Sequence, residues 1–253
     1  LQNIPVRTEL GREIRKAFVA SPGRILVGAD YSQIELRLLA HISGDEGLIA
    51  AFNSGEDIHT STAAEVFGVD KASVTREQRS AAKAVNFGIV YGISDYGLAK
   101  NIGVSRKEAG EFIRRYLEKY CGVQEYMHRC VEEGRKKGYV TTLMGRRREL
   151  PEIKSSNFNT RSFGERVAMN MPIQGTAADI IKMAMVNVHK RLEEEGLKAR
   201  LILQIHDELI IDTPFDEEQR VRKLLAECMQ NVMKLKVPLI ADVSSGHSWF
   251  DTK

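Results

Sequence analysis

The spacing of the strand-like segments is the feature that most constrains the fold of this chain. Strand-like segments cluster at residues 24–30, 201–212 and 237–243, whereas the long stretch between the first two has mainly helical composition. Strands from such distant parts of a chain share one sheet only if the intervening residues form a lobe of their own. The sequence therefore predicts an α+β fold: an antiparallel sheet covered by helices, with a mainly helical lobe inserted at about residues 46–167.

Composition sets broad limits on function. The 253 residues are 43% hydrophobic, enough for a sizeable core in one or two domains. With 37 basic and 34 acidic residues, the formal charge of +3 does not by itself indicate nucleic acid, although basic runs at 135–137 and 146–148 are candidate phosphate contacts. The three cysteines lack metal-binding spacing, which is typical of reduced cytosolic thiols. No apolar run approaches about 18 residues, so we expect no membrane partner.

The segment Asp30-Tyr31-Ser32-Gln33-Ile34-Glu35 follows the first apolar run directly. Asp30 should stand at the end of a buried strand, and Glu35 in the first turn of the helix that Ser32 caps. A carboxylate at a rigid strand end is a good ligand for Mg²⁺, which proteins usually hold with one or two carboxylates plus substrate phosphates. The alternative is a solvated aspartate that caps the helix.

A second polar segment, His206-Asp207-Glu208, separates the apolar runs 201–205 and 209–211. This pattern predicts a hairpin, although the turn lacks the Asn-Gly or Asp-Gly pair that two-residue hairpins favour. Carboxylates from two separate strand ends can clamp two metal ions about 3.5–4 Å apart, as in-line displacement at phosphorus requires. Asp30 and Asp207 are both placed where they could form such a clamp.

The most specific pattern is the four-residue spacing of Arg79, Lys83, Phe87 and Tyr91. Residues 76–92 have helical composition, so these side chains form one stripe about 18 Å long, while Ala82, Val85 and Ile89 form another that suits the core. The two cations can grip a triphosphate, and the two aromatic rings can lie against a base and sugar. A solvated basic face would explain the cations but not the aromatic residues on the same line.

Three of these segments match the motifs of a known family. DYSQIELR at 30–37, RSAAKAVNFGIVYG at 79–92 and His206-Asp207-Glu208 resemble motifs A, B and C of family A (DNA polymerase I type) DNA polymerases, and LQNIPVRT at 1–8 and NMPIQGTAAD at 170–179 also match. The resemblance covers essentially the whole chain. It implies a palm sheet at 1–45 and 168–253 with an inserted fingers lobe at 46–167. It also implies that the family's thumb and exonuclease-like domain lie upstream, so we expect an excised piece that extends primers slowly or not at all.

The resemblance also implies a role for each matching residue. Asp30, Asp207 and the backbone carbonyl of Tyr31 would hold two Mg²⁺ ions, which Mn²⁺ can replace, and Glu208 would support this metal site. Lys83 would be the acid for the leaving pyrophosphate. The residues expected to bind the incoming nucleotide are Arg7, Gln33, Glu35, His59, Arg79, Lys83, Phe87 and Tyr91. Those expected to contact DNA are Arg166, Asn170, Gln174 and His206.

The implied function is template-directed addition of deoxynucleotides to a primer 3′ end, in DNA replication and repair. The implied partners are primer-template DNA and deoxynucleoside triphosphates, and we expect a cytoplasmic, nucleoid-associated bacterial monomer. The residues themselves leave two other classes open: a different Mg²⁺-dependent enzyme such as a nuclease or phosphatase, and a catalytically silent nucleic-acid-binding module. Nucleotide-dependent primer extension separates the first from a polymerase, and loss of a metal carboxylate would mark the second.

Two local features of the later helices are also predicted. Residues 160–195 are expected to form helices that Pro172 interrupts or kinks, because proline lacks the amide donor. Gly196 is expected to terminate the last of them, and residues 216–235 to form a helix that covers the sheet through an apolar stripe.

Overall fold

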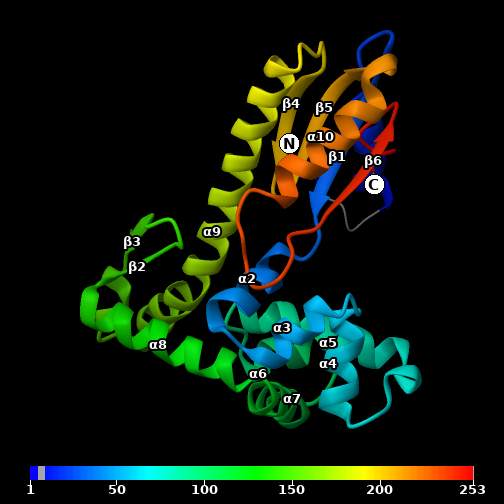
Figure 1. Cartoon of the computed structure of the whole chain (residues 1–253). Coiled ribbons are helices and arrows are strands. Elements are labelled where there is room, and N and C mark those ends of the chain that lie inside the picture. The colour runs from blue at the N-terminus through cyan, green and yellow to red at the C-terminus, as the bar shows by residue number, and fades with distance from the viewer. Residues whose placement is uncertain (5–8, 253) are drawn as a thin grey trace. The chain divides into compact units, whose positions relative to one another are not determined.

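The computed structural model describes residues 1–4 and 9–252 (Figure 1). The chain forms two compact units, and each is described by itself. Unit 1 comprises Leu1–Ile34, Ala177–Lys234 and Leu239–Lys253, and unit 2 comprises Glu35–Thr176 and Leu235–Pro238. The predicted α+β class is confirmed, since a four-stranded antiparallel sheet is combined with many helices. None of the described helices is both long enough and apolar enough to cross a bilayer.

The sheet lies in unit 1 and has the strand order β4-β5-β1-β6, with antiparallel pairing throughout. Its strands are β1 (Arg24–Tyr31), β4 (Arg200–Ile205), β5 (Glu208–Pro214) and β6 (Ala241–Gly246). The central strands β1 and β5 are largely buried, as their unbroken apolar runs predict. The last strand begins at Ala241 rather than at 237, because Pro238 cannot donate a hydrogen bond to a neighbouring strand.

The two faces of the sheet are covered differently. On one face Tyr31 of β1 donates its hydroxyl to the carbonyl of Met229 at 2.7 Å, so that α10 (Glu218–Gln230) packs over the sheet (Figure 1). On the other face, Trp249 packs with Leu26, Ile205 and Ile210 in a buried apolar cluster. Ile4 and Phe18 pack against the same cluster, so both ends of the chain contribute to this core.

The remaining elements of unit 1 are short, apart from the end of α9. They are α1 (Glu9–Glu13), η1 (Ile14–Ala17) and η4 (Phe215–Glu217). The predicted cap at Gly196 is confirmed: this glycine has φ +64°, and the next amide, that of Leu197, donates to the carbonyl of Leu192 at 3.0 Å.

The expected break at Pro172 is wrong, since α9 (Phe158–Glu194) is one continuous helix, and the alternative of a kink stays a prediction. Proline removes a single backbone hydrogen bond, and the surrounding turns supply others. The hydroxyl of Thr176 donates to the carbonyl of Pro172 one turn earlier and accepts the amide of Leu143 at 3.1 Å. Tertiary contacts thus hold the helix through its proline.

Unit 2 is mainly helical. Its elements are α2 (Ile34–Ser43), α3 (Glu46–Asn53), α4 (Ile58–Phe67), η2 (Lys71–Ser73), α5 (Arg76–Val90), α6 (Asp95–Ile102), α7 (Arg106–Lys119), α8 (Cys121–Lys137), β2 (Tyr139–Thr141), β3 (Arg147–Glu149), η3 (Pro151–Lys154) and the first part of α9. The sequence marks several helix starts: Thr75 forms a capping box with Gln78, and Ser105 forms another with Glu108. The β2–β3 hairpin is separate from the main sheet.

Candidate functional site

The carboxylates of the segments around Asp30 and Asp207 lie at the same end of paired strands in unit 1. Asp30 of β1 stands directly opposite Glu208 of β5, and Asp207 occupies the two-residue turn that joins β4 to β5. The amide of Tyr31 donates to the carbonyl of Asp207 at 3.1 Å, which ties the end of β1 to this turn. Strand pairing therefore brings two distant segments of the sequence together.

The backbone at this end of the sheet is strained at two positions. Gln33 and His206 both have φ +54°, and they are the only non-glycine residues with positive φ in the described part of the chain. Such a conformation costs about 1–3 kcal/mol per residue and is common at functional sites. In His206 it follows from the tight turn, where glycine or asparagine is usual. The turn is held by Gln204, whose amide donates to the His206 carbonyl at 2.7 Å, and by a 3.1 Å contact of His206 Nε2 with the Gln2 carbonyl.

Glu208 differs from its neighbour Asp207 in being only 2% exposed. Both of its carboxylate oxygens accept the indole N–H of Trp249, at 3.1 and 3.2 Å, and Arg15 Nη1 lies 4.0 Å from Oε2. The sequence reasoning missed Arg15 and Trp249. The available signal was the single tryptophan of the chain, whereas Arg15 stands among other charged residues and was not marked by its neighbours.

The donor set at this strand end suits a hard cation. Within residues 1–4 and 9–252, no group of three or more His, Cys, Asp or Glu side chains could hold a metal by itself. Asp30, Asp207 and the Tyr31 carbonyl offer two carboxylates and one backbone oxygen, which are oxygen donors of the kind that a hard divalent cation takes together with substrate phosphates. The chemistry of these donors therefore fits a hard cation.

The cationic-aromatic stripe occupies α5 in unit 2. Arg79 and Lys83 are exposed, Phe87 is half-buried, and Tyr91 at the helix end is 45% exposed. The second stripe of the same helix, formed by Ala82, Val85 and Ile89, is buried. The apolar stripe is thus buried, as predicted, and the two cations lie outside the core.

A polar network lies beside the first half of this stripe. Arg79 Nε donates to Asp57 Oδ2 at 2.6 Å, and Asp57 also caps α4 through the amide of Thr60. Burial alone would raise the pKa of Asp57, but the hydrogen bonds from Arg79 and Thr60 outweigh it and lower the pKa to about 2. Asp57 is therefore a fixed negative charge that holds the Arg79 guanidinium.

His59, which the sequence predicts beside the phosphates, is only 3% exposed. Its Nδ1 lies 3.0 Å from the side-chain nitrogen Nδ2 of Asn86, and its ring centroid is 5.7 Å from that of Phe87. Burial lowers the pKa of His59 to about 4, helped by the positive charges of Arg79 and Lys83. The imidazole is therefore neutral at pH 7 and packs under Phe87.

At the other end of the stripe, the Tyr91 hydroxyl donates to Glu35 Oε2 at 2.7 Å. Glu35 lies in the first turn of α2, so this bond links the segment that begins at Asp30 to the stripe on α5, within unit 2. Arg166, Asn170 and Gln174 lie along α9; the outer two are exposed, and Asn170 is half-buried. Arg7, the remaining predicted residue, lies outside the described residues.

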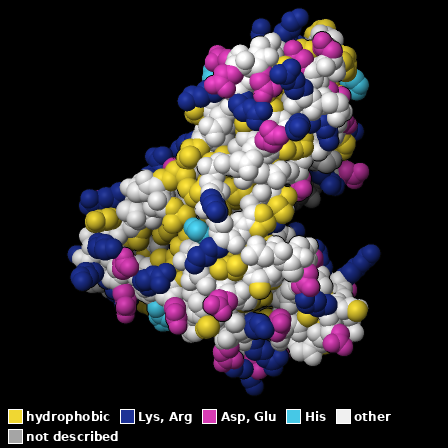
Figure 2. Space-filling view, in the orientation of Figure 1, with side chains coloured by type: hydrophobic (Ala, Val, Ile, Leu, Met, Phe, Trp, Pro, Cys, Tyr) yellow, Lys and Arg dark blue, Asp and Glu magenta, His cyan; other side chains and the backbone are white. Residues whose placement is uncertain are grey.

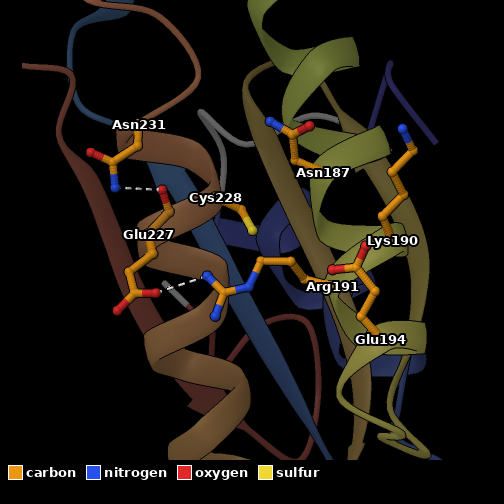
Figure 3. Close-up of a pocket in the computed structure, with 7 residues that line it drawn as sticks. All are labelled: Asn187, Lys190, Arg191, Glu194, Glu227, Cys228 and Asn231. Atoms are coloured by element: carbon orange, nitrogen blue, oxygen red, sulfur yellow. Dashed lines mark hydrogen bonds and ion pairs between the residues drawn. The ribbon is translucent and has the colours of Figure 1, made fainter.

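A separate pocket of about 390 Å³ lies between α9 and α10 in unit 1 (Figure 3). Arg191 enters it from α9 and pairs with Glu227 of α10 at 2.8 Å. At the pocket wall, burial raises the pKa of the Cys228 thiol. The charge of Arg191 is thus neutralised and the thiol is protonated, so this pocket offers no evident catalytic group.

Comparison with known proteins identifies the family. A family model described as DNA polymerase family A matches residues 1–251. This chain belongs to DNA polymerase family A. The resemblance that the three motifs indicate is therefore confirmed, and it extends along nearly the whole of this family A chain.

Individual members of family A are also closely similar. DNA polymerase I of Bacillus subtilis is 60% identical over 254 residues, and that of Caldicellulosiruptor bescii is 56% identical over 253 residues. Both alignments include 100% of this chain, which spans 29% and 30% of the length of those relatives. The solved POL domain of Pol1 from M. smegmatis, in complex with DNA primer-template and dNTP, has a TM-score of 0.95 at 47% identity, over 100% of this chain and 45% of that one.

Proposed function

We propose that this chain is the polymerase portion of a DNA-directed DNA polymerase, which adds deoxynucleotides to a primer 3′ end in bacterial DNA replication and repair. The observation that carries the proposal is the pairing of β1 with β5, which sets Asp30 beside the Asp207 turn. High identity to DNA polymerase I along the whole chain supports the same reaction. The residue ranges 1–45 and 168–253 would form the palm, and 46–167 the fingers.

Asp30, Asp207 and the backbone carbonyl of Tyr31 would hold two Mg²⁺ ions, or Mn²⁺ in their place. When bound, such ions stabilise the attacking and leaving oxygens of an in-line displacement. Asp30 and Asp207 supply the negative charge for this clamp from a pair of strands fixed by backbone hydrogen bonds. Rigid placement matters because the geometry of the displacement tolerates little error.

The side chains of α5 would bind the incoming nucleotide. Arg79 and Lys83 would form charge-assisted hydrogen bonds with its triphosphate, with Arg7 and His59 near the same phosphates. Lys83 would also donate a proton to the leaving pyrophosphate. Because Asp57 holds Arg79, the triphosphate would compete with this carboxylate for the guanidinium.

The sugar and base would lie against aromatic rings. Phe87 would pack on the incoming nucleotide and Tyr91 near the templating position, with Gln33 and Glu35 around the sugar. The hydrogen bond from Tyr91 would keep Glu35 where a ribose 2′-hydroxyl would clash. Arg166, Asn170, Gln174 and His206 would contact primer-template DNA. We propose a monomer in the bacterial cytoplasm, associated with the nucleoid.

Primer extension with Mg²⁺ and all four deoxynucleotides tests this function, measured on the chain joined to the upstream thumb that the resemblance implies, because slow extension is expected of the chain alone. Asp30→Asn and Asp207→Asn should each lower the extension rate about 1,000-fold, because a metal clamp contributes several kcal/mol to the transition state. Asp216→Asn removes an exposed carboxylate of the same unit and should leave extension unchanged. Near-parental rates for either site variant at saturating Mg²⁺ would contradict the assignment, and primer cleavage in place of extension would indicate a nuclease.

A further inference from the structure

Arg15 and Trp249 form a cluster with Glu208, the residue that directly follows the turn His206-Asp207, here called the carboxylate turn. Trp249 donates its indole N–H to both Glu208 oxygens, and Arg15 Nη1 lies 4.0 Å from Glu208 Oε2. The guanidinium carbon of Arg15 is also 4.1 Å from the centroid of the Trp249 ring. Each member of the cluster therefore contacts the other two.

This cluster is almost sealed from water. The side chains of Arg15 and Glu208 are 8% and 3% exposed, and Trp249 is fully buried. The rings of Phe18 and Trp249 are nearly perpendicular, with centroids 5.5 Å apart, and the Phe18 carbonyl accepts the Trp249 backbone amide at 2.8 Å. A buried carboxylate is tolerated only when it is paired and hydrogen-bonded, so Glu208 depends on both partners.

The position of Glu208 gives the cluster its importance. Glu208 directly follows Asp207 in sequence and lies opposite Asp30 across the strand pair. Residues directly opposite each other in antiparallel strands place their side chains on the same face. An unrestrained carboxylate here would add its charge to those of Asp30 and Asp207 and would compete for the same cation.

We propose that Arg15 and Trp249 are positioning residues for the carboxylate turn. Acting through Glu208, they fix Asp207 relative to Asp30 and keep the Glu208 carboxylate out of the coordination of the metal. This inference rests on the proposed function, because it assumes that Asp30 and Asp207 bind the ions. Arg15 from the N-terminal segment and Trp249 from the C-terminal segment would thus help to position Asp207.

The variant Trp249→Phe tests the indole hydrogen bond. Phenylalanine keeps an aromatic ring beside Arg15 and Phe18 but lacks the N–H donor. Removing partners that orient metal ligands typically weakens metal affinity 10- to 100-fold. We therefore expect the Kd for Mn²⁺, measured by electron paramagnetic resonance of the free ion, to rise at least about tenfold.

Two further variants separate positioning from general loss of stability. Tyr126→Phe removes a partly buried hydrogen bond, from the Tyr126 hydroxyl to the Met169 carbonyl at 2.8 Å in unit 2, and should leave the Kd for Mn²⁺ unchanged. Arg15→Met should raise the Kd as Trp249→Phe does, whereas Arg15→Lys keeps the charge but loses the planar group that stacks on Trp249, and should recover only part of the affinity. Thermal unfolding measured on all variants corrects for lost folding.

Trp249 also provides an optical signal, because it is the only tryptophan of the 253 residues. Addition of Mg²⁺ should shift its emission, and Asp207→Asn should abolish the shift. If the parent chain bound no Mn²⁺ even with a deoxynucleoside triphosphate present, beyond what the triphosphate binds alone, the proposed function would fail. If the parent bound Mn²⁺ and folded Trp249→Phe bound it equally well or more tightly, the positioning role alone would be overturned, and Trp249 would be only a core residue.

Discussion

At the scale of single residues, the backbone strain at His206 has a measurable cost. In the left-handed region a side chain costs about 1–2 kcal/mol that glycine avoids, although glycine loses about 0.5–1 kcal/mol through the greater freedom of the unfolded chain. We therefore expect His206→Gly to be more stable than His206→Ala by about 1 kcal/mol in chemical denaturation. Both variants lose the imidazole contact to the Gln2 carbonyl, so the comparison isolates the backbone. An alanine variant as stable as the glycine variant would argue against strain at this turn.

The buried imidazole of His59 predicts a specific dependence of stability on pH. Its pKa in the folded protein is about 4, against an ordinary value of 6.5. Between these values the unfolded chain binds more protons, so the stability that neutral His59 contributes is lost as pH falls from about 6.5 to about 4. His41, whose pKa burial also lowers, acts in the same direction.

An NMR titration of the His59 imidazole should therefore have its midpoint near pH 4. The variant His59→Gln should show a smaller loss of unfolding free energy across the same pH window, with the contribution of His41 remaining. A midpoint close to 6.5 would mean that the imidazole is open to water in solution.

Tyr116 has a buried hydroxyl group that makes no evident contribution to the stability of the fold. Its side chain is fully buried, and its hydroxyl has no hydrogen-bond partner among the residues that the structure describes. Because an unsatisfied buried hydroxyl is destabilising, Tyr116→Phe should be as stable as the parent or more stable. Tyr126→Phe, which loses a made hydrogen bond, should cost about 1 kcal/mol by the same denaturation measurement. The reverse order would mean that Tyr116 has a partner in solution.

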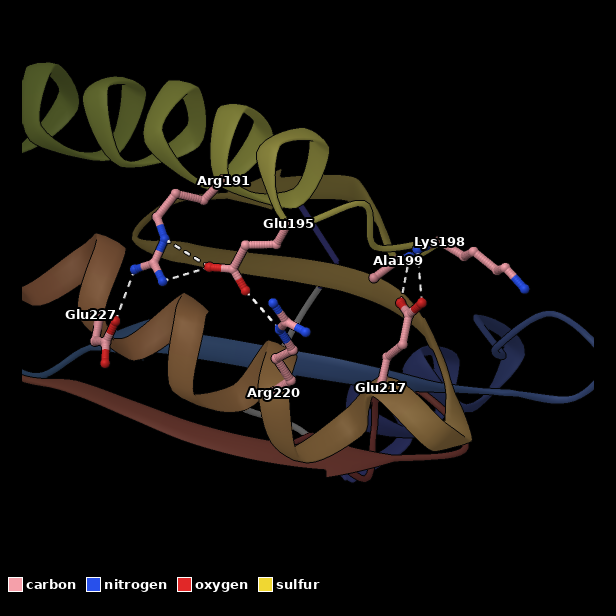
Figure 4. Close-up of polar contacts among 7 residues, drawn as sticks. All are labelled: Arg191, Glu195, Lys198, Ala199, Glu217, Arg220 and Glu227. Carbon is pink, nitrogen blue, oxygen red and sulfur yellow. Dashed lines mark hydrogen bonds and ion pairs between the residues drawn. The ribbon is translucent and has the colours of Figure 1, made fainter.

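At the scale of elements, polar contacts at one end of unit 1 join α9, β4 and α10 (Figure 4). Glu195 accepts from Arg191 and from Arg220, at 2.6 and 2.7 Å. Glu217 accepts the backbone amides of Lys198 and Ala199, both at 2.9 Å, just before β4 begins. The pairs of arginine with glutamate are partly exposed, so each contributes little to stability. The two backbone amides, in contrast, have few other hydrogen-bond acceptors.

We therefore expect Glu217→Ala to lower the unfolding free energy by about 1–3 kcal/mol, because it leaves two amides unpaired, one of them on the buried Ala199. The neighbouring Asp216→Ala removes the same charge from an exposed site and should change stability by less than about 0.5 kcal/mol. Equal effects of the two variants would show that charge, and not the amide contacts, is what matters there.

Much of this element structure could be predicted from local sequence. The run before Asp30, the hairpin around Asp207 and the two stripes of α5 follow from periodicity, which reflects local backbone geometry. The continuity of α9 through Pro172 could not be predicted, since it depends on Thr176 and Leu143 contacts. The same holds for Arg15 and Trp249, whose role depends on how both ends of the chain fold over the sheet.

At the scale of the whole molecule, charge is dispersed. Basic and acidic side chains are interspersed on the face seen in Figure 2, in keeping with a formal charge of only +3. The proposed binding of primer-template should therefore depend on a few local cations and not on a long-range field. Arg148 in β3 is exposed and belongs to the basic run at 146–148, whereas Arg114 in α7 is paired with Glu118 at 2.7 Å.

We expect the Kd for a labelled primer-template, measured by fluorescence anisotropy at several KCl concentrations, to rise steeply with salt. Each phosphate contact contributes about 0.9 to the slope of log affinity against log salt. Arg148→Gln should lower this slope by about that amount if its guanidinium meets a phosphate, and should weaken binding equally for all DNA sequences. Arg114→Gln removes the same charge from the same unit, but its guanidinium is already neutralised by glutamate, so its slope should equal that of the parent. Identical slopes for the two variants would exclude Arg148 from the DNA contact and leave the β2–β3 hairpin outside the binding surface.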